Sequence, residues 1–123
     1  MTPLVCIHAG GKVITLAAGV FTLSWTHSVE KTRWQEQWIA TPQGLVVQEA
    51  RVQGSGAGME PGENARREGN WWVWTPNVAP LRELVLASSG ATGSGWTICD
   101  ADGCRELGRE QQQPIVLRPC RKP

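Results

Sequence analysis

The chain has 123 residues and a formal net charge of +1, with 41% hydrophobic and 19% charged residues. This size favours one globular domain with its own hydrophobic core. The near-neutral charge gives no electrostatic reason to expect a nucleic-acid partner. The longest apolar run, Val13–Leu23, is too short for a transmembrane segment.

Glycine, proline and tryptophan set the character of the sequence. Fourteen glycines and eight prolines favour many turns over long helices, and seven tryptophans accompany one phenylalanine and no tyrosine. From the N-terminus, Leu4–His8 and Lys12–Ala17 are typical of a hairpin around Gly10 and Gly11, a dipeptide suited to a two-residue turn.

The segment Phe21–Trp38 predicts two strands joined by a turn near Glu30 and Lys31. Apolar and polar residues alternate in it, as expected of strands with one buried face. If the apolar faces coincide, His27 and Glu36 point inward beside tryptophans. The predicted cross-strand pairs are Leu23 with Trp38, Trp25 with Glu36, and His27 with Trp34.

A second hairpin extends this sheet through a turn at residues 41–44 and a strand at Leu45–Gln53. Pairing Ala40 with Leu45 would place Trp38 opposite Val47, Glu36 opposite Glu49 and Trp34 opposite Arg51. Unpaired buried charge is costly, so charged groups gathered there must pair, bind a ligand or stay hydrated. We call the expected cluster the predicted polar pocket, and its members are His27, Glu36, Glu49 and Arg51.

Residues 54–70 are rich in glycine and charged residues, which predicts a surface loop. Alternatively, residues 56–59 fold over the end of the sheet that carries His27 and Glu36, because glycine permits close approach. Trp71–Trp74 is interpreted as a strand buried on both faces, or alternatively as an exposed recognition surface. Further strands are expected at Leu84–Ser88, Trp96–Cys99 and Cys104–Leu107.

These segments predict an all-β fold, an antiparallel β-sandwich or partly closed barrel of about eight or nine short strands. Residues 1–108 form the expected single domain, and residues 109–123 a polar C-terminal tail around one strand-like piece, Ile115–Leu117.

The four cysteines leave two interpretations open. Cys99 and Cys104 flank a predicted turn, so they are either a cross-strand disulfide in an oxidising compartment or two reduced thiols. Neither CxxC nor HxxxH spacing occurs, so no zinc site is expected. If Met1 is the true start, the expected location is the cytoplasm, with the periplasm as the alternative.

The segment His27–Lys31 (HSVEK), then Glu36, then Gly56–Met59 (GAGM), resembles a bacterial domain of unknown function, family 1850. The resemblance runs from about Leu4 to Leu107. Members are often encoded beside TAXI-type tripartite ATP-independent periplasmic (TRAP) transporters. The resemblance therefore implies an accessory role in solute uptake, with no demonstrated biochemical activity. The candidate ligand-binding residues then also include Ser28, Glu30, Gly56, Gly58 and Met59.

Three functions fit the sequence. The first is a non-enzymatic binding module that holds a small polar solute or TRAP transporter subunits, without a cofactor; a zinc or manganese site at His27, Glu36 and Glu49 is a variant of it. The second is a structural polar network in a protein-interaction domain. The third is a hydrolase in which Glu36 and Glu49 act as acid and base. No nucleophile or cofactor motif in the sequence accompanies them.

Overall fold

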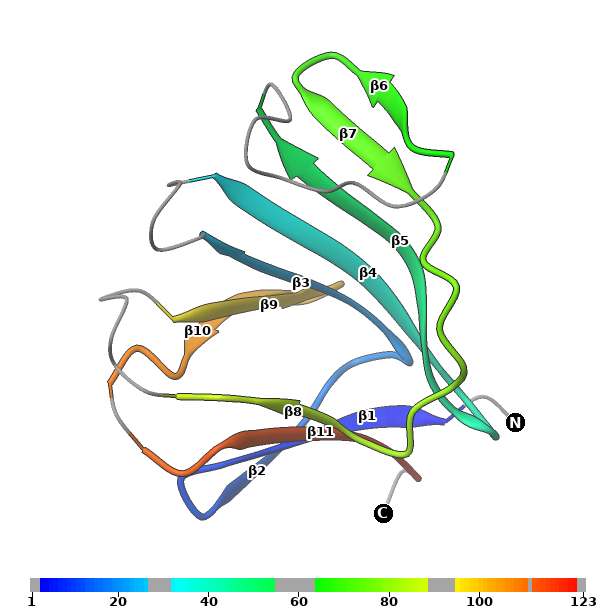
Figure 1. Cartoon of the computed structure of the whole chain (residues 1–123). Coiled ribbons are helices and arrows are strands. Elements are labelled where there is room, and N and C mark those ends of the chain that lie inside the picture. Colours follow the sequence, from blue (N-terminus) through cyan, green and yellow to red (C-terminus); the bar gives the residue numbers. More distant parts are fainter. Residues whose placement is uncertain (1–2, 27–31, 55–63, 89–94, 111, 122–123) are drawn as a thin grey trace.

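The computed structural model describes residues 3–26, 32–54, 64–88, 95–110 and 112–121. These residues form eleven β-strands, more than the eight or nine expected, and no helix. The strands make two antiparallel sheets that do not close into a barrel, so the predicted all-β sandwich is confirmed (Figure 1). None of the described residues forms a helix of the length and hydropathy needed to span a membrane. The strands are β1 (Leu4–Ala9), β2 (Lys12–Thr15), β3 (Val20–Thr26), β4 (Arg33–Thr41), β5 (Gly44–Gln53), β6 (Arg66–Glu68), β7 (Trp71–Trp74), β8 (Leu84–Leu86), β9 (Trp96–Asp100), β10 (Gly103–Leu107) and β11 (Ile115–Cys120).

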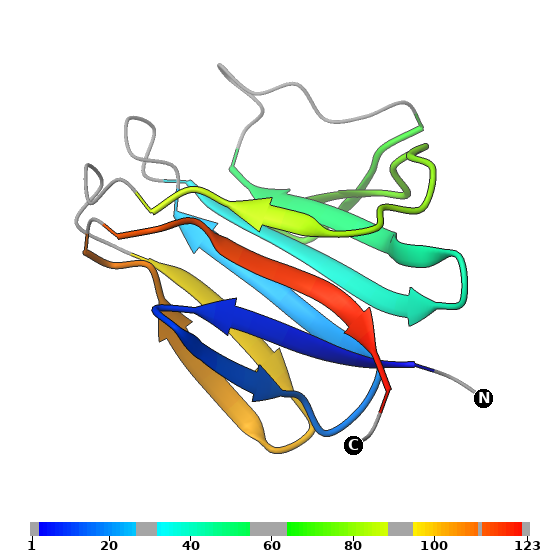
Figure 2. The same cartoon turned by 90° about the horizontal axis from the view of Figure 1, so that it is seen from below.

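The smaller sheet has the order β2-β1-β11-β8 and joins the two ends of the chain (Figure 2). Leu4 pairs with Cys120 and Ile7 with Leu117. The strand-like piece expected at Ile115–Leu117 within residues 109–123 belongs to β11, where Ile115 and Leu117 are fully buried. The partner of this strand could not be predicted from local sequence, because it pairs with β1 more than a hundred residues away.

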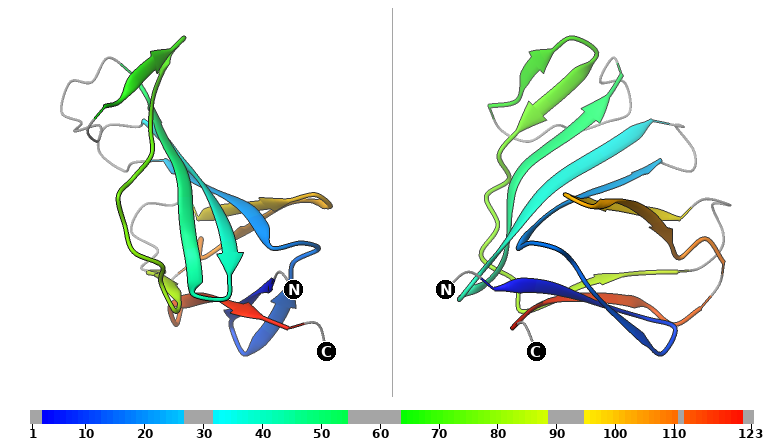
Figure 3. Two further views of the ribbon diagram at one scale, coloured as in Figure 1. Left: turned by 90° about the vertical axis from the view of Figure 1, so that its right-hand side faces the viewer. Right: turned by 180° about the vertical axis from the view of Figure 1, so that it is seen from behind.

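The larger sheet has the order β10-β9-β3-β4-β5-β7-β6. Its β7 and β6 end rises well beyond the four-stranded sheet, as the back view in Figure 3 makes clear. The two sheets enclose one core, to which most strands contribute. Its buried members are Val5, Ile7, Leu16, Phe21, Leu23, Trp38, Ala40, Leu45, Val47, Leu86, Ile98, Ile115 and Leu117.

Strand β6 lies within the segment predicted to be a loop. Its three residues, Arg66–Glu68, are charged and exposed, so they carry no apolar alternation that would indicate a strand. The strand forms because the turn at Gly69, whose φ is +61°, folds it back onto β7. A positive φ suits glycine, which has no Cβ to clash.

The hairpin of β3 and β4 has the predicted faces but a register shifted by two residues. Phe21 pairs with Trp38, Leu23 with Glu36, and Trp25 with Trp34. A shift of two preserves which side chains point inward, because the side-chain period of a strand is two. In this register aromatic residues pair directly across the two strands. The ring centroids of Phe21 and Trp38 are 6.3 Å apart and their planes are nearly parallel. Such cross-strand aromatic pairs stabilise a sheet.

Candidate functional site

A β-bulge separates the members of the predicted polar pocket. Trp38 pairs with Val47 as predicted, but the register then shifts, and Gln37 pairs with Glu49 while Glu36 pairs with Ala50. Because side chains alternate between faces, the extra residue in β5 moves everything beyond it to the opposite face. The expectation that Glu36 and Glu49 share one face is wrong.

The other predicted site residues divide in the same way. Arg51 pairs with Gln35 rather than Trp34, so it shares the face of Glu49 and not that of Glu36. The remaining candidates lie outside the described residues: His27, Ser28, Glu30, Gly56, Gly58 and Met59.

On the outer face, the face of the larger sheet turned away from the core, charged side chains pair with one another. Glu49 lies 2.8 Å from Arg51 and 3.5 Å from Arg66, and Arg66 lies 2.6 Å from Glu68. The guanidinium of Arg51 also lies over the ring of Trp71, 5.7 Å from its centroid. These four charged residues, which we call the outer ion-pair chain, satisfy one another. Their partial exposure limits what each pair contributes to stability.

On the inner face, Glu36 has a different environment. Trp38 Nε1 donates a hydrogen bond of 3.0 Å to Glu36 Oε1. Burial raises the pKa of the Glu36 carboxyl above its ordinary value, and the hydrogen bond from Trp38 partly opposes this rise. Among the described residues no cation forms an ion pair with Glu36.

Five half-buried tryptophans lie on this inner face, and we call them the tryptophan row. The ring centroids of Trp25 and Trp34 are 6.0 Å apart with nearly parallel planes. Trp96 packs on Trp25 at 5.2 Å, and Trp74 meets Trp34 edge-on at 6.2 Å. Trp72 completes the row, because Val52 pairs with both Trp34 and Trp72 across the sheet.

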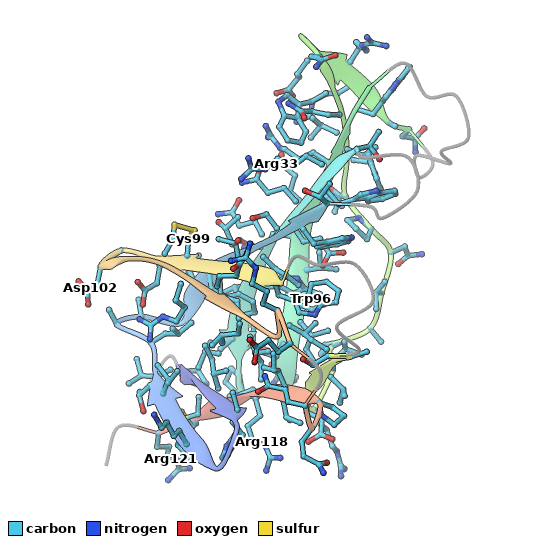
Figure 4. All side chains as sticks on the ribbon, turned by 90° about the vertical axis from the view of Figure 1, so that its left-hand side faces the viewer. Arg33, Trp96, Cys99, Asp102, Arg118 and Arg121 are labelled. Carbon is cyan, nitrogen blue, oxygen red and sulfur yellow. A yellow bond between two sulfur atoms is a disulfide. The ribbon has the colours of Figure 1, made fainter. Side chains whose placement is uncertain are left out.

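Strand alternation separates the row from the outer face. Figure 4 shows Cys99 with its disulfide and Arg33 on the outer side of the larger sheet and Trp96 on the other side. In β7, Trp72 and Trp74 belong to the row while Trp71 points to the outer face. The alternation within Trp71–Trp74 predicts rings on both faces of this strand, as observed.

Two indole N–H groups of the row are buried and unpaired. Among the described residues, Trp34 Nε1 and Trp72 Nε1 find no hydrogen-bond partner, and neither does the hydroxyl of Thr32, two residues before Trp34. By contrast, Trp96 Nε1 donates to the carbonyl of Ala87 at 2.9 Å. A buried donor without a partner costs about 1–3 kcal/mol. Buried polar groups are rarely left in this state unless something else meets them.

Both pairs of cysteines form disulfides. Cys99 joins Cys104 across the β9–β10 hairpin, which is the oxidised alternative of the two left open by the sequence. Cys6 joins Cys120 and links β1 to β11. In the described part of the chain, no three His, Cys, Asp or Glu side chains gather as a metal site would require.

Replacing Glu36 by glutamine is expected to stabilise the protein at neutral pH. The folded pKa of Glu36 lies above its ordinary value of 4.5, so folding favours the protonated form. The contribution of the protonated carboxyl to the free energy of unfolding is fully present below the unfolded pKa and is lost as pH rises through the folded pKa. Urea unfolding across this pH range should therefore show Glu36→Gln gaining stability over the native protein as pH rises, with the difference vanishing at low pH.

The matched control is Glu49→Gln on the outer face, which removes two partly exposed ion pairs. It should lower stability at neutral pH by about 1 kcal/mol or less. If Glu36→Gln instead behaves like Glu49→Gln, the carboxylate of Glu36 has a stabilising partner and burial does not dominate its energetics.

The fold and the site together define a small antiparallel β-sandwich with a tryptophan-lined face on its larger sheet. Residues 21–107, more than half of the chain, match the domain of unknown function DUF1850, and the chain belongs to this family. No curated protein and no solved structure matches it.

Proposed function

We propose that this protein is a non-enzymatic binding module whose ligand docks on the tryptophan row beside Glu36. The observation that carries the proposal is the pair of buried, unpaired indole N–H groups of Trp34 and Trp72. A ligand acceptor placed there would remove the cost of leaving them unpaired. Aromatic surface with a few directed polar groups is the usual composition of a small-molecule site.

The residues favour binding over catalysis. A hydrolase in which Glu36 and Glu49 act as acid and base needs both carboxyls at one substrate, but the bulge places them on opposite faces of the sheet. We therefore do not propose this reaction. Glu49 and Arg51 fit the structural alternative instead, because the outer ion-pair chain satisfies them without a ligand.

The biological setting that we propose follows from the family and from the cysteines. The family resemblance suggests an accessory role beside TAXI-type TRAP transporters, with a small solute or a transporter subunit as partner. Pairing of all four cysteines supports an oxidising compartment, the periplasm rather than the cytoplasm. Structural disulfides form and persist in such compartments and are rare in a reducing cytosol.

Thermal unfolding against a panel of sugars, amino acids, organic acids and organic cations tests the binding proposal. A ligand at about a hundred times its Kd should stabilise the native protein by about 2.7 kcal/mol, or raise Tm by about 10 °C. The rise should be lost in Trp34→Phe, which keeps a ring but removes the N–H donor. It should persist in Trp71→Phe, the matched change on the outer face.

The proposal fails if no member of the panel, and no cognate transporter subunit added to it, raises Tm. It fails equally if Trp34→Phe retains the full rise, because the ligand would then bind elsewhere.

A further inference from the structure

We propose that the tryptophan row receives a neutral, polyhydroxylated ring, the chemistry of a sugar unit. This inference rests on the proposed binding function and specifies its ligand class. The row combines aromatic ring faces, two unpaired N–H donors and one carboxyl group. Each of these three components restricts the ligand in a different way.

The carboxyl group of Glu36 disfavours an anionic ligand. No cation among the described residues forms an ion pair with it, so a bound anion would place a second negative charge in a poorly solvated region. The contact of Arg67 with a ring of the row does not offset the negative charge of Glu36. Arg67 lies over the Trp72 ring at 5.1 Å, but its side chain is exposed and its Nε already donates to the carbonyl of Gly69.

The N–H donors disfavour a purely cationic ligand. A quaternary ammonium group would interact with the ring faces and with Glu36. It offers no acceptor, so the indole N–H groups of Trp34 and Trp72 would stay buried and unpaired. Polar groups left unpaired in a complex weaken binding strongly.

A hydroxyl group meets both requirements, because it accepts one hydrogen bond and donates another. Ligand hydroxyls could accept from the indoles of Trp34 and Trp72 and donate to Glu36, where only one carboxyl oxygen has a described side-chain partner. The hydroxyl of Thr32 is a third unpaired group of the same kind.

The rings supply the remaining contact. An indole face carries partial negative charge and attracts the slightly positive C–H groups of an apolar ring face. Trp25 and Trp34 present nearly parallel rings 6.0 Å apart, and Trp96 and Trp74 extend the aromatic surface on either side. A sugar ring has such a C–H face together with hydroxyls at its edge. The row therefore matches a sugar in both apolar and polar contacts.

Nitrogen-15 NMR of the indole N–H groups in the whole chain tests this inference residue by residue. The probes are glucose, galactose, N-acetylglucosamine and cellobiose, compared with choline, citrate and glycerol. We expect at least one sugar to shift the signals of Trp34 and Trp72 in a saturable way while leaving Trp71 in place. Trp34→Phe should weaken that sugar about tenfold, and Trp71→Phe should not.

Glu36→Gln provides the second variant, because an amide still accepts and donates hydrogen bonds. A neutral ligand should retain measurable affinity for it, whereas a cationic ligand would lose the charge that holds it. Saturable shifts with choline or citrate but with no sugar would overturn the ligand class and leave the binding function standing. Equal shifts with glycerol would also overturn it. If neither these probes nor the thermal panel gives a response at the row, both proposals fall.

Discussion

Removing the Cys6–Cys120 disulfide is expected to lower the free energy of unfolding by about 5 kcal/mol, the largest effect predicted for any change here. The bond joins residues separated by 114 positions, so it restricts almost the whole unfolded chain. It also links β1 to β11, the two central strands of the smaller sheet. Urea unfolding of the Cys6→Ala, Cys120→Ala double variant measures the loss.

The hairpin disulfide provides the comparison. Cys99 and Cys104 are only 5 positions apart, so the same chain-entropy argument gives about 2 kcal/mol for Cys99→Ala with Cys104→Ala. Equal losses in the two double variants would show that loop closure does not govern either bond. Both variants should be compared under non-reducing conditions, so that the remaining disulfide stays intact.

Gly44→Ala is expected to destabilise the protein by about 3 kcal/mol or more, through strain and steric overlap together. Gly44 has a φ of +133°, and a Cβ at this position would lie 2.4 Å from the carbonyl oxygen of Leu81. That oxygen accepts a 2.7 Å hydrogen bond from the amide of Leu45, so the backbone cannot move aside without losing it. Thermal or urea unfolding gives the size of the loss.

Gly11→Ala separates the two causes. Gly11 also has a positive φ, +78°, but beyond its two chain neighbours no described residue has an atom within 4 Å of a Cβ built there. It should cost only about 1 kcal/mol, the conformational part alone. A loss at Gly44 no larger than that at Gly11 would mean that the contact with Leu81 adds nothing.

Side-chain faces were more predictable from the sequence than strand partners. In β3 and β4, alternation correctly placed Leu23, Trp25 and Glu36 on one face, because the face depends only on odd and even positions. The partners were wrong by two residues, because they depend on the length of a turn that no pattern specifies. The prediction for Ala40 and Leu45 was correct, since four turn residues with Pro42 and Gly44 define that connection.

The prediction of the polar pocket was wrong because β5 contains one extra residue at a bulge. The bulge between Trp38 and Gln37 does not disturb the alternation of side chains in β4. In β5 it places Ala50, rather than Glu49, on the inner face. The apolar residues of β5 do change phase, from Leu45 and Val47 to Ala50 and Val52. That change is the signal that could have revealed the bulge.

The tryptophan row was only partly accessible from the sequence. Trp25 and Trp34 were expected on one inner face, but Trp72, Trp74 and Trp96 join them through strand neighbours that are distant in the chain. Unpaired indole donors cannot be recognised from sequence at all, because they depend on which acceptors the folded chain brings close.

Pairing of β1 with β11 also determines how the molecule could be attached to something else. Leu4 lies opposite Cys120, so the described chain enters and leaves at the same end of the two central strands of the smaller sheet. The tryptophan row lies toward the other end of the strands, where β3 ends and β4, β7 and β9 begin. A tether, carrier protein or sensor surface fused at either end would therefore lie at the end of the strands opposite the tryptophan row.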